Sequence, residues 1–278
     1  MKLGLLGAGI SRSSMPRLQH FLGNQVNVNV DYGLIDGKDF SGFDPCEEVR
    51  RARVKGYVGL NVTHPYKQSI HKLVTRPVID GHERIGSYNT LRFTDTEILG
   101  ANTDFSGFMR GYRYRRGDAT PGHVVMCGAG GVGRAVAFGL LELGCSHISI
   151  YDVAPQQAES LVATIRSHGG SAEVVEKAKL PDVMGEAQGL VNCTALGMYS
   201  YPGNAFPAEA IGCQQWAFDA VYTPLRTDFL EACTAADLQC LSGFDLWIFQ
   251  GFDAFRVFTG IDVQADEQLI GTALSWLD

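Results

Sequence analysis

The sequence predicts an α/β fold built from two domains. In residues 1–100, short apolar runs typical of strands alternate with helical patterns, and the alternation restarts after residue 121 around a glycine-rich turn. Alternation of this kind is typical of a mostly parallel sheet covered by helices. The length of 278 residues also fits two domains of ordinary size.

The first half of the chain supplies the elements of one domain. Expected strands cover residues 3–6, 27–35 and 57–62, and expected helices cover residues 16–22 and 45–54. Ser13 or Ser14 is available to cap the first helix, because serine hydroxyls accept hydrogen bonds from the free N–H groups there.

The second half repeats the pattern in the order of a nucleotide-binding βαβ domain. Expected strands cover residues 123–127, 147–152, 190–193 and 216–220, and expected helices cover residues 133–143 and 156–167. The basic run at residues 112–118 precedes this domain and is interpreted as the connection to it. A solvated helix end is the favoured explanation of its charge, and attraction of a phosphate is the alternative.

Composition and sequence patterns make several kinds of partner and site less favoured. A net charge of −7 argues against nucleic acid, which needs a basic surface, but allows a small anionic substrate. The seven cysteines form no Cys-x-x-Cys pair, which is typical of reduced thiols in a cytoplasmic protein, and the histidine pattern predicts no metal site. No apolar stretch reaches membrane-spanning length, and the first residues lack a signal-peptide pattern.

Residues 128–133 match the pattern G-x-G-x-x-G between an expected strand and an expected helix. Glycines in this context let backbone N–H groups approach a pyrophosphate closely. The alternative is a tight turn with no ligand, which is less favoured because a second marker is present. The candidate cofactor-binding residues of the loop are Gly128, Gly130, Gly131, Val132 and Gly133.

Asp152 is the second marker, because it closes the next expected strand. An acidic residue there accepts a hydrogen bond from the ribose 2′-OH of NAD and repels the 2′-phosphate of NADP. The following residues carry no basic side chain before Arg166. NAD is therefore the expected cofactor, with NADP less favoured.

A second glycine pair, Gly7 and Gly9, resembles such a loop only in part. Arg12 stands where a third glycine would fall, and no acidic residue closes a following strand at the right spacing. We therefore interpret residues 7–9 as a strand–loop turn that shapes a substrate pocket.

Three polar segments of the first half read Asn-Val-Thr-His-Pro-Tyr-Lys at 61–67, Gly-Ser-Tyr-Asn-Thr at 86–90 and Asn-Thr-Asp at 102–104. With residues 192–194, 219–224, Gln250 and the pair 254–255, they resemble the motifs of the shikimate dehydrogenase family, in the family's order. The resemblance spans nearly the whole chain.

The resemblance implies a substrate-binding α/β domain at 1–104 plus 238–278, a Rossmann-type domain at 105–237, and an active site in the cleft between them. It implies a nicotinamide-dependent oxidoreductase, monomeric or homodimeric, that interconverts a ring alcohol and ketone of a shikimate- or quinate-like carboxylic acid. It marks Lys67 and Asp104 as the catalytic pair and adds Thr194 and Gly243 to the cofactor site. The implied substrate-binding residues are Ser13, Thr63, Asn89, Tyr222 and Gln250.

The chemistry of these side chains suits the implied reaction. Oxidising a secondary alcohol removes a hydride and a proton, and Lys67 is placed to exchange the proton while Asp104 orients it. Taken singly, Thr63, Asn89 and Asp104 are typical turn residues. Their joint order with Lys67 favours a catalytic site.

Three departures from the family pattern leave the substrate open. Met15 replaces a serine that would bind the substrate carboxylate, and Arg12 replaces a histidine. The family stretch G-x-G-M-L reads Gly-Phe-Asp-Leu-Trp at residues 243–247. An aminoshikimate-type substrate stays open, as does a metabolite sensor of low turnover, although retention of Lys67 and Asp104 favours an enzyme.

Overall fold

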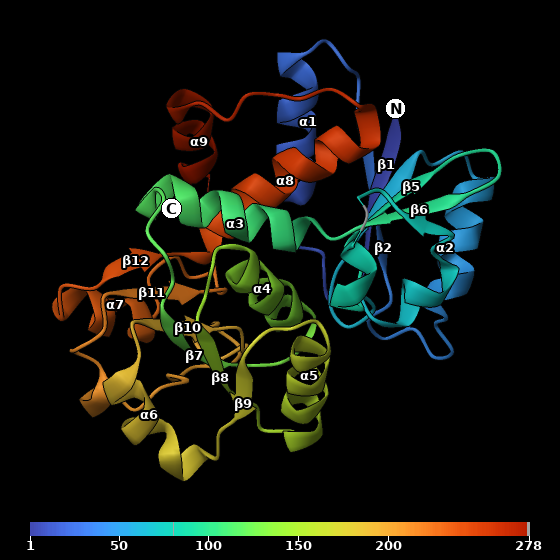
Figure 1. Ribbon diagram of the computed structural model, residues 1–278. Helices are drawn as coiled ribbons and strands as arrows, with labels where there is room; N and C mark the ends of the chain where they lie inside the picture. The colour runs from blue at the N-terminus through green and yellow to red at the C-terminus, as the bar shows by residue number, and fades with distance from the viewer. Residues whose placement is uncertain (80, 277–278) are drawn as a thin grey trace. The chain divides into compact units, whose positions relative to one another are not determined.

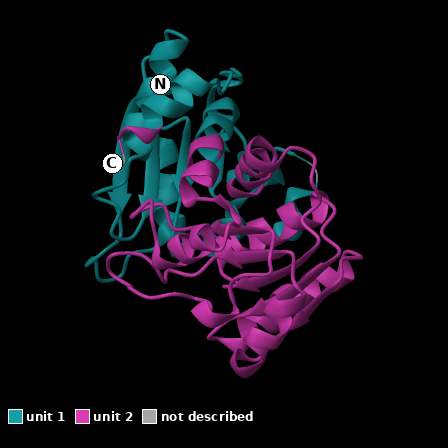
Figure 2. Cartoon of the chain, turned by 90° about the vertical axis from the view of Figure 1, so that its left-hand side faces the viewer, with its two compact units in different colours: residues 1–103, 250–273 teal, residues 104–249, 274–278 magenta. Residues whose placement is uncertain are grey.

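The protein folds into two compact α/β units in the computed structural model, which describes residues 1–79 and 81–276 (Figure 1). The first unit combines residues 1–103 with residues 250–273, and the second holds residues 104–249 with the short piece after residue 273 (Figure 2). The predicted two-domain α/β fold is confirmed. The division places residues 238–249 in the second unit, whereas the sequence led us to group them with the first.

The first unit contains a six-stranded mixed sheet in the order β2-β1-β3-β5-β6-β4. Pairing is parallel for β1 with β2 and β3, and antiparallel for β5 with both β3 and β6. The sequence did not predict this antiparallel hairpin. The strands are Lys2–Gly7 (β1), Asp31–Asp36 (β2), Gly59–Val62 (β3), Arg76–Pro77 (β4), Thr90–Phe93 (β5) and Ile98–Ala101 (β6).

Helices α1 (Met15–Gln25) and α2 (Pro45–Val54) follow the first two strands. The Asp44 carboxylate caps α2 by accepting hydrogen bonds from the backbone N–H groups of Cys46 and Glu47. Ser14 occupies the N-cap position of α1 without a side-chain bond, whereas the Ser13 hydroxyl accepts from the Met15 N–H at 3.2 Å. Both helices begin near the predicted residues.

The last part of α8 (Gly243–Thr259) packs closely within the first unit. A Cβ atom at Gly251 would lie 2.3 Å from Leu18 of α1, and one at Gly59 would lie 2.7 Å from Phe258. These glycines therefore let the helix approach both α1 and β3. The helix α9 (Glu267–Leu274) follows it in the chain.

The second unit contains a six-stranded parallel sheet in the order β12-β11-β10-β7-β8-β9. This is the strand order of a Rossmann fold, in which ligands bind beyond the carboxyl ends of the strands where the order reverses. Here that point lies between β7 and β10. The strands are His123–Cys127 (β7), His147–Tyr151 (β8), Ala172–Val174 (β9), Gly189–Asn192 (β10), Trp216–Asp219 (β11) and Gln239–Leu241 (β12).

Helices connect these parallel strands (Figure 1). They are α4 (Gly131–Glu142), α5 (Pro155–Ser167), α6 (Leu180–Glu186) and α7 (Asp228–Ala235), whereas α3 (Thr103–Arg116) precedes β7. The basic run at 112–118 contributes the last residues of α3, where Arg115 pairs with Asp245 at 2.8 Å. A helix end, which was the favoured explanation of the charge of this run, is therefore found at residues 112–116, and one of its arginines has a specific partner.

Apolar side chains from the sheet and the flanking helices fill the core of each unit. Among the helices that the structure describes, none is long and apolar enough to cross a membrane. Within residues 1–79 and 81–276, no group of three or more histidine, cysteine or acidic side chains is arranged to hold a metal ion.

Candidate functional site

The glycine loop after β7 has the backbone geometry of a nucleotide-binding turn. Gly128 has a φ of +99°, and a Cβ atom there would lie 2.6 Å from the carbonyl carbon of Cys193. A Cβ atom at Gly133 would lie 2.1 Å from the Gly128 carbonyl oxygen. Side chains at these two positions would therefore collide with backbone that cannot move aside.

The other glycine positions of the loop leave space for a ligand. Gly130 is the N-cap of α4, and nothing lies within 4 Å of a Cβ atom built on it. Gly131 and Val132 form the first turn, where backbone N–H groups lack helical partners and attract an anion. The loop therefore fits the pyrophosphate of a dinucleotide.

Asp152 directly follows β8 and faces this loop. One carboxylate oxygen accepts a hydrogen bond from the Ala129 N–H at 2.7 Å, and the other accepts from the Ala154 N–H at 2.9 Å. The N-cap position of α5 is Ala154 itself. Asp152 thus fixes the glycine loop to the end of β8. Arg166, the first basic residue after Asp152 in the chain, donates to the Ala172 carbonyl at 2.8 Å.

Thr194 lies on the loop after β10, beside the glycine loop. Its hydroxyl donates to the Asn192 side-chain oxygen at 2.7 Å and accepts from the Leu196 N–H at 3.1 Å. The Asn192 NH₂ group donates to Asp219 at 2.9 Å. The hydrogen bonds therefore join the loops that follow β10 and β11.

Sequence reasoning missed Asp219 as a functional residue, although it is the first residue of a matched motif. Its buried carboxylate also accepts hydrogen bonds from the Thr227 hydroxyl at 2.6 Å and the Val221 N–H at 3.0 Å. Burial raises the pKa of Asp219 to about 6, against the opposing effect of these hydrogen bonds. Asp219 thereby holds both ends of the segment that carries Tyr222.

Tyr222 stacks on Trp247, with ring centroids 6.0 Å apart and planes inclined by 20°. Burial raises the pKa of the Tyr222 phenol, which therefore stays protonated as a hydrogen-bond donor. Gly243 starts the helix that carries Trp247, and a Cβ atom there would lie 2.5 Å from the Ala220 carbonyl oxygen. Only glycine allows this approach.

Asp245, one of the departures from the family pattern, has structural partners. It is buried, pairs with Arg115, and accepts a hydrogen bond from the Ser242 N–H at 2.8 Å. Its charge is thus compensated within the second unit, whereas the other marked change, Trp247, stacks on the predicted substrate-binding residue Tyr222.

In the first unit, a buried polar network joins Asn89 to Gln250. The Asn89 side-chain oxygen accepts from the Thr103 N–H at 2.7 Å, and the Thr103 hydroxyl lies 3.3 Å from the Gln250 side-chain oxygen. The Thr90 hydroxyl lies 3.1 Å from that of Thr103. The fold therefore brings together two predicted substrate-binding residues that are distant in sequence.

Thr63 and Lys67 lie on the loop after β3. The Thr63 N–H donates to the Leu6 carbonyl at 2.9 Å, which sets this loop against the end of β1. The Lys67 carbonyl accepts from the Tyr88 N–H at 3.2 Å, and its side chain is half-buried. Asp104 is buried in α3 and belongs to the second unit, so its pairing with Lys67 stays a prediction.

One expectation about the first glycine pair is wrong. Asp36 ends β2, and its carboxylate accepts hydrogen bonds from the N–H groups of Gly9 at 2.8 Å and Ile10 at 3.0 Å. An acidic residue therefore does close the following strand and holds the loop. Hydrogen bonds from the backbone of Lys38 and Gly9 lower the pKa of Asp36.

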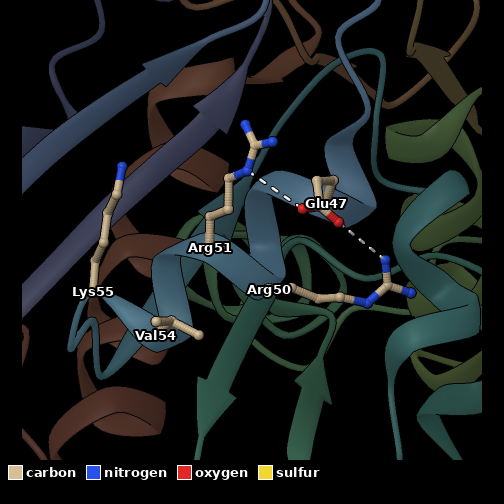
Figure 3. Close-up of a pocket in the computed structure, with 5 residues that line it drawn as sticks. All are labelled: Glu47, Arg50, Arg51, Val54 and Lys55. Atoms are coloured by element: carbon tan, nitrogen blue, oxygen red, sulfur yellow. Dashed lines mark ion pairs between the residues drawn. The ribbon is translucent and has the colours of Figure 1, made fainter.

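The surface hollow drawn in Figure 3 lies on α2 and contains none of the candidate residues. Three of its charged side chains are engaged with each other, since Glu47 lies 3.4 Å from Arg51 and 3.8 Å from Arg50. Exposed ion pairs on one helix stabilise that helix slightly and make no binding site.

Comparisons with known proteins agree with these motifs. Residues 5–91 match the family model for the shikimate dehydrogenase substrate binding domain. A shikimate dehydrogenase (NADP(+)) of Streptomyces avermitilis is 37% identical over 265 residues, which cover 93% of this chain and 90% of the relative. The chain belongs to the shikimate dehydrogenase family.

Other members of the shikimate dehydrogenase family match with similar coverage. A quinate/shikimate dehydrogenase (NAD(+)) of Corynebacterium glutamicum is 36% identical over 265 residues, covering 94% of this chain and 93% of the relative. The structure of quinate dehydrogenase from Corynebacterium glutamicum in complex with NAD superposes with a TM-score of 0.91 at 34% identity, covering 99% of both chains. The family resemblance expected from the motifs is thus confirmed.

Proposed function

We propose that this member of the shikimate dehydrogenase family interconverts a ring secondary alcohol and its ketone on shikimate- or quinate-like acids, with NAD preferred. The named relatives support the substrate class, and they divide between NAD and NADP. The observation that carries the cofactor choice is Asp152, whose carboxylate is fixed 2.7 Å from the Ala129 N–H of the glycine loop.

The second unit would hold the dinucleotide, which supplies a hydride acceptor when bound. The loop formed by Gly128, Gly130, Gly131, Val132 and Gly133 fits the pyrophosphate because it is open at Gly130 and because the first N–H groups of α4 lack helical partners. Asp152 would accept a hydrogen bond from the ribose 2′-OH, and its charge would repel a 2′-phosphate. Thr194 and Gly243 shape the neighbouring loops.

Lys67 would act as the general base in the oxidation and as the general acid in the reduction. As the C–H electron pair leaves as hydride, the O–H proton passes to the Lys67 Nζ atom, and the carbonyl double bond forms. In the reduction, the protonated amine returns the proton to the developing alkoxide. Asp104 would orient Lys67 and bind a substrate hydroxyl.

The remaining proposed residues would hold the ring acid. Asn89 and Gln250 are oriented by the Thr103 network, so their positions are fixed before substrate arrives. Thr63 and Tyr222 would bind hydroxyl or carboxylate oxygens, and Ser13 would contribute its hydroxyl near the carboxylate.

A substrate panel tests the proposal. Wild-type protein is assayed with quinate, shikimate and an amino analogue, each with NAD and NADP, by absorbance of the reduced nicotinamide. We expect turnover of at least one acid and a higher kcat/KM with NAD. Calorimetry on the same panel detects binding without turnover, a result that would favour a sensor over an enzyme.

A further inference from the structure

The indole of Trp247 is a buried donor with no acceptor among the described residues. Its side chain is 4% exposed, and its Nε1–H makes no hydrogen bond within residues 1–79 and 81–276. The buried Trp216 shows the usual arrangement, since its Nε1–H donates to the Pro121 carbonyl at 3.0 Å. Buried N–H groups in folded proteins are nearly always paired, so an orphaned one points to a ligand.

Two aromatic neighbours fix the orientation of this indole. Tyr222 stacks on it with ring centroids 6.0 Å apart, and the Phe244 ring lies at 5.8 Å. Two rings packed against the indole hinder its rotation toward water. The packing around Trp247 therefore holds its unpaired N–H in a fixed orientation within the second unit.

The position of Trp247 in the sheet topology also points to a ligand. Tyr222 follows the carboxyl end of β11, and α8 begins directly after β12, so both rings come from segments at the carboxyl edge of the sheet. Ligands of open α/β sheets bind at this edge. The phenol and the indole are two neighbouring donors there.

We infer that the Trp247 Nε1–H donates a hydrogen bond to a carboxylate oxygen of the bound ring acid, next to the Tyr222 phenol. This inference rests on the proposed function. A carboxylate offers an acceptor oxygen to each of two neighbouring donors, and bonds to a charged acceptor are the stronger ones. The family motif carries leucine at this position, which has no donor, so Trp247 makes carboxylate binding in this chain distinct.

An NMR titration reads the donor directly. Full-length protein is labelled with ¹⁵N-tryptophan, which gives three indole signals, and Trp247→Phe assigns one of them. Quinate, shikimate and NAD are added separately. We expect the Trp247 signal to move downfield with a ring acid and to stay in place with NAD alone.

Steady-state kinetics provide the second measurement. Trp247→Phe keeps an aromatic ring for stacking and removes the donor, so KM for the ring acid should rise about tenfold or more. We expect kcat to change less than twofold and KM for NAD to stay unchanged. Phe244→Leu is the matched control, because it loosens the packing of the indole and keeps its N–H.

The outcomes separate the inference from the proposed function. If calorimetry shows a ring acid bound while the Trp247 signal stays in place, the inference is wrong and the proposed function stands. A signal that responds to NAD alone also overturns it. If no ring acid binds or is turned over by wild-type protein, both are overturned. The titration itself uses wild-type protein, and Trp247→Phe serves there only to assign the signal that the ring acid should move.

Discussion

Replacing Asp152 by alanine should reverse much of the preference for NAD. The carboxylate is held by the backbone N–H groups of Ala129 and Ala154, at 2.7 and 2.9 Å, so its charge is fixed where the ribose would lie. A hydrogen bond to a charged acceptor contributes about 1.5–3 kcal/mol. Its loss should lower kcat/KM for NAD by roughly 10- to 150-fold.

The same substitution removes a charge that repels the 2′-phosphate, so kcat/KM for NADP should rise in absolute terms. The fold should lose little, because Asp152 is half-buried and water can replace it at the two N–H groups, at a cost of about 1 kcal/mol each. Asp152→Asn is the control, since its oxygen still accepts from a backbone N–H but carries no charge.

The assay compares kcat/KM for both cofactors in wild type, Asp152→Ala and Asp152→Asn, with thermal unfolding measured without cofactor. If both variants lose activity equally with NAD and NADP, Asp152 only holds the loop and the charge argument is refuted. The same holds if wild-type protein uses NADP as well as NAD.

Four further predictions follow from the structure. Gly128→Ala should destabilise the fold by about 1–3 kcal/mol through its positive φ alone. Gly130→Ala should unfold like wild type in urea, because its Cβ meets no protein atom. The same Cβ would occupy the space proposed for the pyrophosphate, so calorimetry should show weaker NAD binding. Lys67→Ala should lower kcat by ~10²–10⁴-fold with unchanged NAD binding; near-normal kcat would remove Lys67 from the mechanism. Burial lowers the pKa of His123 below 6.5, so unfolding takes up a proton and stability should fall as pH drops below about 6.5; a His123→Gln variant with the same pH dependence in urea unfolding would contradict this. Met15→Ser should lower KM for shikimate by restoring a hydrogen-bond donor to the substrate carboxylate. It should also lower the Tm, because Met15 is buried. An unchanged KM would exclude the missing serine as the cause of any altered substrate preference.

Features set by local rules could be predicted from the sequence. The glycine loop, its strand and its helix came out within two residues, because a positive φ at Gly128 and the close approach at Gly133 demand glycine wherever they occur. Asp152 was found for the same reason, since its role depends on the end of one strand. Both predictions depend only on neighbouring residues in the sequence, so they can be made without knowing which distant residues come into contact.

Features that depend on distant contacts were missed or incomplete. The antiparallel strands β5 and β6 were not predicted, because each has only four residues and so short a run carries little periodicity. The role of Asp36 was missed because the predicted strand ended one residue early and the expected spacing came from a complete glycine motif. The orphaned indole of Trp247 is a property of its surroundings, which sequence does not contain.

The network around Thr103 shows what three-dimensional contacts add to the residues that the sequence proposed for substrate binding. Sequence marked Asn89 and Gln250 as binding residues but gave no orientation for their amides. In the fold, the Asn89 oxygen is held by the Thr103 N–H, and the Gln250 oxygen lies against the Thr103 hydroxyl. Because both oxygens are engaged within the described residues, the NH₂ groups are the ends of these amides left to bind a ligand. If Asn89 and Gln250 bind the ring acid as we propose, they therefore do so as donors to its hydroxyl or carboxylate oxygens.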